Sequence, residues 1–217
     1  MTAKSILIWL GVIVVTIGAI VGLYYLSSPG GGNGSSVGLT LTEPVSASDW
    51  RRGPDGAKAV LVEYSDFQCP ACASYEPLLQ QLSGEFGNSL QFVYREFPLR
   101  SIHQNADLAA RAAEAAGVQG KFWEMHDKIF QTQADWSKLS NSAAEAKFKS
   151  YAQALGVNIP QFASDLNSPA VMAKINNDIS SGNQSGIQGT PTFFLNGKDA
   201  GYPQGYEEFK AIIQKVL

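Results

Sequence analysis

The sequence EYSDFQCPAC, residues 63–72, contains both cysteines of this 217-residue chain. A short run at residues 59–64, which is apolar and rich in strand-forming residues, leads into the pair, and the apolar residues after it recur at helical spacing. The cysteine pair is therefore expected at a junction between a strand and a helix. Pro70 suits the first helical position, where a missing N–H costs nothing, so Cys69 falls at the helix start and Cys72 lies one turn further on.

The two thiols are expected to differ because only Cys69 stands at the helix N-terminus. Unpaired N–H groups and the positive end of the helix dipole favour an anion there, which predicts a low pKa and an exposed thiol for Cys69. Cys69 is thus predicted to be the attacking thiol and Cys72 the resolving thiol. The redox-active group would be the Cys69–Cys72 disulfide itself, and no other cofactor is expected.

Two other uses of a Cys-x-x-Cys pair are weaker. A structural zinc site needs four ligands, and only His103 and His126 remain as candidates without a second cysteine pair, so no metal site is predicted. A disulfide that closes so short a loop would add little stability by restricting the unfolded chain. Redox chemistry is the interpretation that the pair favours.

The composition limits the class of protein. Hydrophobic residues make up 45% of the chain and charged residues 16%, which suits one substantial core with or without an embedded subdomain. The formal net charge is −3, so the chain has no broad basic surface, and no nucleic-acid partner is predicted.

The first 45 residues indicate a membrane anchor followed by a tether. Residues 1–4 carry Lys4 and are expected in the cytoplasm, and residues 5–26 form an uncharged run that is long enough for one transmembrane helix. A cleaved signal peptide is the alternative, although the run is long for one and lacks a clear Ala-x-Ala site. Residues 27–45 are predicted to be a flexible Gly/Ser linker. A domain at 46–217 would then lie outside the cytoplasm, held at the cell membrane by a single pass.

The folded part is expected in the order β-α-β, helical insertion, β-β-α, which is an α/β fold. A strand, a helix and a second strand in succession predict a right-handed crossover with parallel strands. Asn-Gly between two strand patterns is a strong hairpin signal. The expected elements are strands at 59–64 and 90–97, a helical insertion at about 104–181, a polar loop at 180–188, a strand at 192–195, the Asn196-Gly197 turn and a helix from 206.

Three motifs together resemble the DsbA-like thiol:disulfide oxidoreductases of the thioredoxin superfamily. They are residues 63–72, the segment QGKFWEMHD at 119–127, and GTPT at 189–192. The resemblance covers roughly Asp49 to Leu217. It implies a thioredoxin-like fold with an inserted helical subdomain, preceded here by the predicted transmembrane helix.

The resemblance also implies roles for residues around the cysteines. Pro191 would be a cis-proline that faces the pair, and Thr190 would offer its backbone to an extended substrate strand. Glu63 matches a buried acid that relays the proton lost by Cys72, the alternative being a solvent-exposed glutamate at a strand edge. The predicted catalytic residues are Cys69, Cys72 and Glu63, and the predicted substrate contacts are Phe67, Pro70, Ala71, Thr190 and Pro191.

The two histidines and the residue before Cys72 complete the expectations at the site. His103 either approaches the cysteines or lies in a surface loop, whereas Met125 and His126 lie on an aromatic-rich stripe that is typical of core packing. Ala71 stands where the proteins most like DsbA carry histidine. A less oxidising pair is therefore expected, because alanine offers neither charge nor hydrogen bond to a thiolate.

Taken together, the motifs and the anchor predict an extracytoplasmic enzyme that forms disulfides in secreted or membrane proteins. Its substrates would be unfolded or reduced secreted proteins, and the resemblance implies recharging by a membrane oxidase of the DsbB or vitamin-K-epoxide-reductase type. A reductase or isomerase of the same fold is the nearest alternative. A tethered metal-binding or chaperone module that uses the same thiols is a further one.

Overall fold

The computed structural model describes residues 38–217. The predicted cytoplasmic segment, the predicted anchor and most of the predicted linker lie outside the described residues. Within 38–217, no helix combines the length and the apolar character needed to cross a bilayer. The structure from Leu39 to Leu217 forms one unit.

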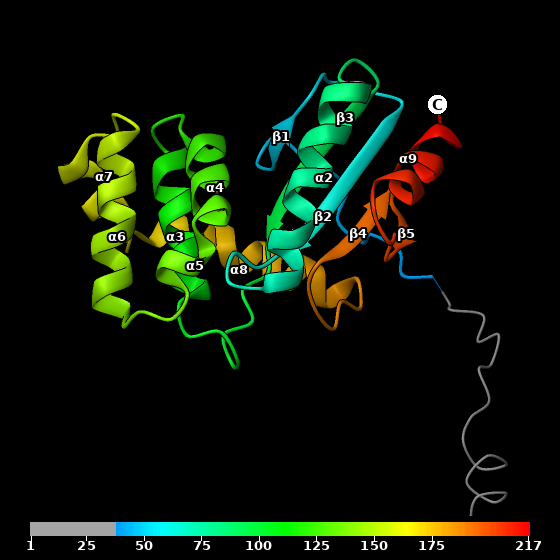
Figure 1. Cartoon of the computed structure of the whole chain (residues 1–217). Coiled ribbons are helices and arrows are strands. Elements are labelled where there is room, and N and C mark those ends of the chain that lie inside the picture. Colours follow the sequence, from blue (N-terminus) through cyan, green and yellow to red (C-terminus); the bar gives the residue numbers. More distant parts are fainter. Residues whose placement is uncertain (1–37) are drawn as a thin grey trace, which may run out of the picture. The chain divides into compact units, whose positions relative to one another are not determined.

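A five-stranded mixed sheet lies at the centre of this unit (Figure 1). β2 (Ala59–Ser65) pairs in parallel with β3 (Leu90–Glu96), as the predicted crossover requires, and antiparallel with β4 (Thr192–Leu195). β1 (Trp50–Arg52) and β5 (Lys198–Gly201) are antiparallel edge strands, so the order is β1-β3-β2-β4-β5. β2 is therefore the central strand, and the cysteine pair follows its carboxyl end.

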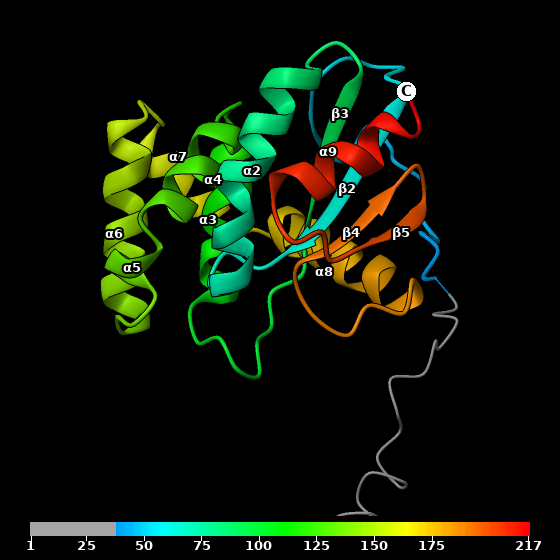
Figure 2. The same cartoon turned by 45° about the vertical axis from the view of Figure 1, so that its right-hand side comes forward.

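Helices cover both faces of the sheet, which explains why β2 and β3 are buried almost throughout. α2 (Pro70–Phe86) and α9 (Tyr206–Gln214) lie over one face, and α8 (Pro169–Gln184) lies behind the other (Figure 2). Alternate residues of β2 point to the two sides: Leu61 packs in the cluster beneath α2, and Val62 packs in the cluster on the opposite face.

The helical insertion stacks beside the sheet (Figure 1). The predicted helical insertion is present, but its two short helices, of four and seven residues, were not predicted. Short helices lack the repeated apolar positions that reveal a longer one. Besides α8, the insertion contains α3 (Ala106–Gly117), α4 (Phe122–Gln131), α5 (Gln133–Trp136), α6 (Asn141–Ala154) and α7 (Ile159–Asp165).

α8 extends into the predicted polar loop at 180–188, so the first part of that prediction is wrong. Ser181 is buried, and its Oγ lies 2.7 Å from the Tyr64 hydroxyl. A Cβ on Gly182 would lie 2.7 Å from the Phe97 ring, so glycine allows the helix to approach the sheet closely there. The small and polar residues that suggest a loop are therefore the ones that allow α8 to contact the aromatic side chains of Tyr64 and Phe97.

The predicted linker at 27–45 ends too late, because residues from Leu39 onward already pack on the sheet. The N–H of Leu41 donates to the Gly197 carbonyl (3.0 Å), and Thr40 forms a bridge with Lys198. The apolar side chains of Leu39, Leu41 and Val45 pack against the hydrophobic cluster on the face of the sheet opposite α2.

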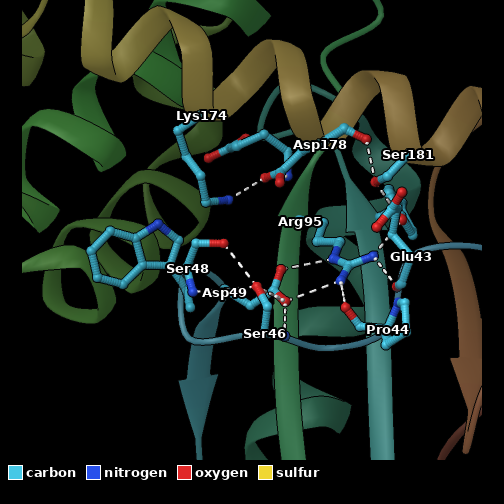
Figure 3. Close-up of polar contacts among 12 residues, drawn as sticks. Glu43, Pro44, Ser46, Ser48, Asp49, Arg95, Lys174, Asp178 and Ser181 are labelled. Atoms are coloured by element: carbon cyan, nitrogen blue, oxygen red, sulfur yellow. Dashed lines mark hydrogen bonds and ion pairs between the residues drawn. The ribbon is translucent and has the colours of Figure 1, made fainter.

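Arg95 fixes this N-terminal segment to the sheet (Figure 3). Its buried guanidinium donates to both carboxylate oxygens of Asp49 (2.8 and 3.0 Å) and to the carbonyls of Glu43 and Pro44 (2.9 and 3.0 Å). A fifth bond reaches the Tyr64 hydroxyl at 2.7 Å. All five donors of the guanidinium are satisfied, as a buried charge requires.

Candidate active site

Cys69 caps α2, and Cys72 lies in the first turn of the helix, as predicted. Cys69 has extended backbone angles (φ −70°, ψ 121°), and Pro70 occupies the first helical position. The structure holds both cysteines as free thiols. Cys69 is only 7% exposed and Cys72 1%, so the prediction of an exposed Cys69 is wrong. The segment just before β4 contacts this thiol, because the Thr190 carbonyl oxygen lies 3.4 Å from Cys69 Sγ.

The two thiols have opposite electrostatic environments. A hydrogen bond from the Cys72 thiol is the main cause that lowers the pKa of Cys69 to about 5; burial opposes it, and backbone N–H groups of the first turn and the Thr190 side chain assist it. Burial raises the pKa of Cys72 well above its usual range, and its bond to Cys69 and the charge of Glu63 raise it further. This contrast is what an attacking and a resolving thiol require.

The Thr190–Pro191 peptide bond is cis, as the resemblance implied. β4 begins at the next residue, so the central sheet holds this bond at the end of a strand next to β2. The Cys69 thiol donates to the Thr190 carbonyl, which places the Thr190 backbone beside the reactive sulfur. Binding of a substrate strand at this position stays a prediction.

Glu63 is buried in the central strand, at 1% exposure, so the alternative of a solvent-exposed strand-edge glutamate is wrong. Its Oε1 accepts a hydrogen bond from Ser65 Oγ (2.8 Å). Burial is the main cause that raises the pKa of Glu63 to about 8; the Ser65 bond opposes it, and the charges of Glu76 and Cys69 add to it. The carboxyl is therefore protonated at neutral pH and able to exchange a proton near it.

The predicted substrate contacts divide into exposed and buried residues. Pro70 and Ala71 are exposed next to Cys69. Phe67 is fully buried, and its ring packs against Tyr94 (5.2 Å between ring centroids) and Phe130 (4.8 Å). The predicted contact of Phe67 with substrate is therefore wrong, because its ring fills the core between β3 and α4.

Asp66 organises the loops around the cysteines, and the sequence analysis missed it. Its buried carboxylate accepts hydrogen bonds from the N–H groups of Gln68 (2.7 Å) and Leu99 (2.9 Å), and it lies 2.6 Å from His103 Nδ1. His103 thus approaches the site through Asp66. An aspartate that ends a strand and precedes a helix is typical of such side-chain-to-backbone turns, and this signal was available.

The helical insertion holds the cysteine loop through two glutamines. Gln133 of α5 donates from Nε2 to the carbonyls of Phe67 (2.8 Å) and Cys69 (3.0 Å). In the opposite direction, Gln68 Nε2 donates to the Ser137 carbonyl (2.7 Å). The unpredicted short helix α5 is therefore part of the frame of the site.

The sheet order and the dithiol at the end of its central strand place this molecule in the class of thioredoxin-like proteins with a Cys-x-x-Cys site. Residues 46–215 match the family model described as thioredoxin, and the chain therefore belongs to the thioredoxin family. The expected thioredoxin-like fold with helices inserted between its strands is confirmed.

Solved structures with this fold include oxidoreductases. The structure of oxidised BdbD from Bacillus subtilis aligns with a TM-score of 0.72 at 21% identity, covering 82% of this chain and 97% of that one. A thioredoxin-like oxidoreductase from Silicibacter pomeroyi aligns with a TM-score of 0.65 at 25% identity, covering 78% of this chain and 92% of that one.

Curated relatives are closer in sequence but much longer. A protein of Salinispora arenicola named Na(+)/H(+) antiporter NhaA 1 is 38% identical over 161 residues, which are 74% of this chain and 24% of the relative. The chain spans about a quarter of the length of the curated relatives it matches. The antiport in their names is a statement about those proteins.

Proposed function

We propose that this chain is a thiol:disulfide oxidoreductase that exchanges disulfides with protein substrates through Cys69 and Cys72. The observation that carries the proposal is the contrast within one pair: Cys69 has a pKa of about 5, whereas that of Cys72 lies well above its usual range. A thiol with a low pKa is both an accessible thiolate and a good leaving group in disulfide exchange.

The proposed reaction starts from the Cys69–Cys72 disulfide. A substrate thiolate attacks the Cys69 sulfur, the bond between the two cysteine sulfurs breaks, and Cys72 leaves and takes a proton from the Glu63 carboxyl. A second substrate thiolate then attacks the substrate sulfur of the mixed disulfide, and Cys69 leaves as its stable thiolate. The substrate has lost two electrons and gained a disulfide, and the cysteine pair has gained both electrons.

Glu63 suits the proton transfer in both directions. Its pKa of about 8 lies below that of Cys72, so the carboxyl gives its proton to a Cys72 thiolate and accepts one when Cys72 attacks a mixed disulfide. Because the pKa of Glu63 lies close to neutral pH, both the protonated and the ionised form of its carboxyl are accessible.

We propose the oxidising direction, in an extracytoplasmic domain anchored at the cell membrane. The uncharged run at 5–26 and Lys4 before it support this location. Reduced secreted proteins would be the substrates, and a membrane oxidase of the DsbB or vitamin-K-epoxide-reductase type would restore the disulfide. Because Ala71 offers no charge or hydrogen bond, the potential should fall between the extremes of about −270 mV for thioredoxin and about −120 mV for DsbA.

Equilibration with glutathione redox buffers tests the direction. An oxidase requires a potential well above that of thioredoxin, and Ala71→His should raise it further, with a tenfold change in the equilibrium constant equal to about 30 mV. A wild-type potential near about −270 mV would favour a reductase instead. Oxidation of a reduced, unfolded model protein tests the activity itself. Cys69→Ser should abolish this oxidation, and retained activity in that variant would refute the proposed function.

A further inference from the structure

Gln133 connects the helical insertion to the main chain of Cys69 itself, and the proposed reaction gives it no part. Its Nε2 donates to the Cys69 carbonyl (3.0 Å) and to the Phe67 carbonyl (2.8 Å). The Cys69 carbonyl also accepts from the N–H of Ala73 (3.1 Å), which begins the hydrogen bonding of α2. A carbonyl oxygen has two lone pairs, so the helix engages one and the insertion engages the other.

The insertion holds the Gln133 amide in a fixed place. Gln133 is half-buried at the start of α5, and the fully buried Trp136 ends the same helix. The Trp136 ring packs on Phe148 of α6 at 5.1 Å between ring centroids, and its Nε1 donates to the Ile129 carbonyl of α4 (2.9 Å). Because α5 is anchored on both α4 and α6, the amide is already ordered where it meets the two carbonyls.

Non-covalent contacts place the Cys69 sulfur in the reduced form. Both cysteines are free thiols in the structure, and Cys69 Sγ lies 3.4 Å from the Thr190 carbonyl oxygen. The N–H groups at the start of α2 and the Cys72 thiol stabilise the Cys69 thiolate only while its sulfur stays over the first helical turn. That position depends on the main chain at Cys69, whose carbonyl is the group that Gln133 and Ala73 hold.

The disulfide form depends less on this support. A bond between the Cys69 and Cys72 sulfurs ties Cys69 to the first turn of α2, so it already removes much of the conformational freedom of Cys69. In the reduced form this freedom is limited by non-covalent contacts such as the Gln133 hydrogen bonds. Gln133 is therefore expected to stabilise the reduced form more than the disulfide form.

We propose that Gln133 is a positioning residue that holds the Cys69 main chain in the reduced form and thereby makes the cysteine pair more oxidising. It acts through Cys69, because its amide bonds to carbonyl oxygens rather than to a sulfur. The inference rests on the proposed function and deepens it, since it makes the helical insertion a determinant of the redox potential. A more stable reduced form raises the potential of the pair.

Equilibration with glutathione measures this potential. Two glutathione thiols lose two electrons and two protons and form glutathione disulfide, and the Cys69–Cys72 disulfide takes up both electrons and both protons and becomes two thiols. Gln133→Met keeps the length of the side chain and its helix propensity but removes both donors. One ordinary hydrogen bond corresponds to about two- to tenfold in an equilibrium constant. The constant for reduction of the pair should fall about threefold or more, which lowers the potential by about 15 mV or more.

Urea unfolding of both redox forms separates this role from a merely structural one. A structural contact alone would contribute equally to both forms, so its loss would leave the potential unmoved. Gln133→Met should instead lower the unfolding free energy of the reduced form more than that of the disulfide form. The difference should match the shift in potential, because the four states form a closed cycle. The pH midpoint at which the Cys69 thiolate absorbs in the ultraviolet should rise in the same variant.

Two further variants complete the test. Gln131→Met is the matched control, because it makes the same change at an exposed glutamine two residues earlier, at the end of α4, and it should leave the potential in place. Gln133→Asn keeps the amide but withdraws it by one methylene, so it should lower the potential in the same direction as Gln133→Met.

Several results would overturn the inference. They are an unmoved or higher potential in the Gln133 variants, equal losses of stability in the two redox forms, and an equal shift in Gln131→Met. A wild-type pair that does not exchange with glutathione would overturn the proposed function and this inference with it. Normal exchange in the wild type with an unmoved potential in Gln133→Met overturns the inference alone.

Discussion

Replacement of Cys72 by alanine or serine tests why the thiol of Cys69 is acidic. The largest cause that lowers the pKa of Cys69 to about 5 is the hydrogen bond from the Cys72 thiol. Cys72→Ala removes that donor, whereas Cys72→Ser replaces it with a hydroxyl at nearly the same position. The backbone N–H groups of the first turn remain in both variants, so the pair of substitutions isolates one side-chain bond.

The expected size follows from the strength of a hydrogen bond to a charged sulfur. Such bonds contribute about 1.5–3 kcal/mol, and one pKa unit corresponds to about 1.4 kcal/mol, so Cys72→Ala should raise the pKa of Cys69 by about 1–2 units. A more basic thiolate is also more nucleophilic. With a Brønsted coefficient of about 0.4–0.5, its limiting rate should rise by about 3- to 10-fold. In Cys72→Ala at mildly acidic pH, the smaller fraction of Cys69 thiolate lowers the reaction rate about as much as the higher nucleophilicity raises it. A rate measured at a single pH therefore cannot distinguish the variants.

The assay is the full pH profile of the reaction with hydroxyethyl disulfide, followed by the mass of the mixed disulfide. The reaction stops there in both variants because neither has a resolving thiol. We expect a midpoint near about 5 in Cys72→Ser, and a higher midpoint with a faster plateau in Cys72→Ala. Equal midpoints would refute the reasoning, and would assign the acidity to the helix terminus and its backbone N–H groups.

Two substitutions test the packing around the site, both by urea unfolding. Gly182→Ala should destabilise the protein by about 1–3 kcal/mol, because its Cβ would lie 2.7 Å from the Phe97 ring, whereas Gly84→Ala in the open interior of α2 should be neutral or stabilising by up to about 1 kcal/mol. Asp49→Ala should cost about 3–5 kcal/mol because it leaves Arg95 buried without its carboxylate, and a loss below about 1 kcal/mol would contradict that role. Burial opposes the ionisation of Asp49, but Arg95 lowers its pKa below the usual value, so in the wild type this contribution should be present above the unfolded-state pKa and lost as the pH falls through the folded one.

The local signals in the sequence were sufficient for the elements that carry the chemistry. A short apolar run rich in strand-forming residues predicted β2, and a proline at the helix start with apolar residues at helical spacing predicted α2. Asn196-Gly197 predicted the hairpin, and these two residues have φ of 49° and 79°. Each of these signals acts within a few residues. The cis bond before Pro191 was expected from the resemblance alone, since spacing indicates only a proline before a strand.

The errors concern contacts between distant parts of the chain. Polarity suggested a loop from residue 180 and a linker up to residue 45, but Ser181 bonds to Tyr64 and Leu41 pairs with Gly197. The position of Phe67 beside the cysteines predicted contact with substrate. The ring is instead buried by α4, which is more than fifty residues away in the sequence. The spacing of apolar residues identifies which face of a helix is buried, but it does not show which other element packs against that face.

His126 shows how packing decides the polar partners of a core residue. Its aromatic stripe predicted a core residue, and the ring is fully buried. Burial also removes water from both ring nitrogens, so their partners inside the protein become decisive. Those partners, Asp127 beside it and Glu76 on α2, are visible only once α4 is laid against α2 and β3. The polar partners of a core histidine therefore depend on which helix faces it, and the sequence alone does not show which helix that is.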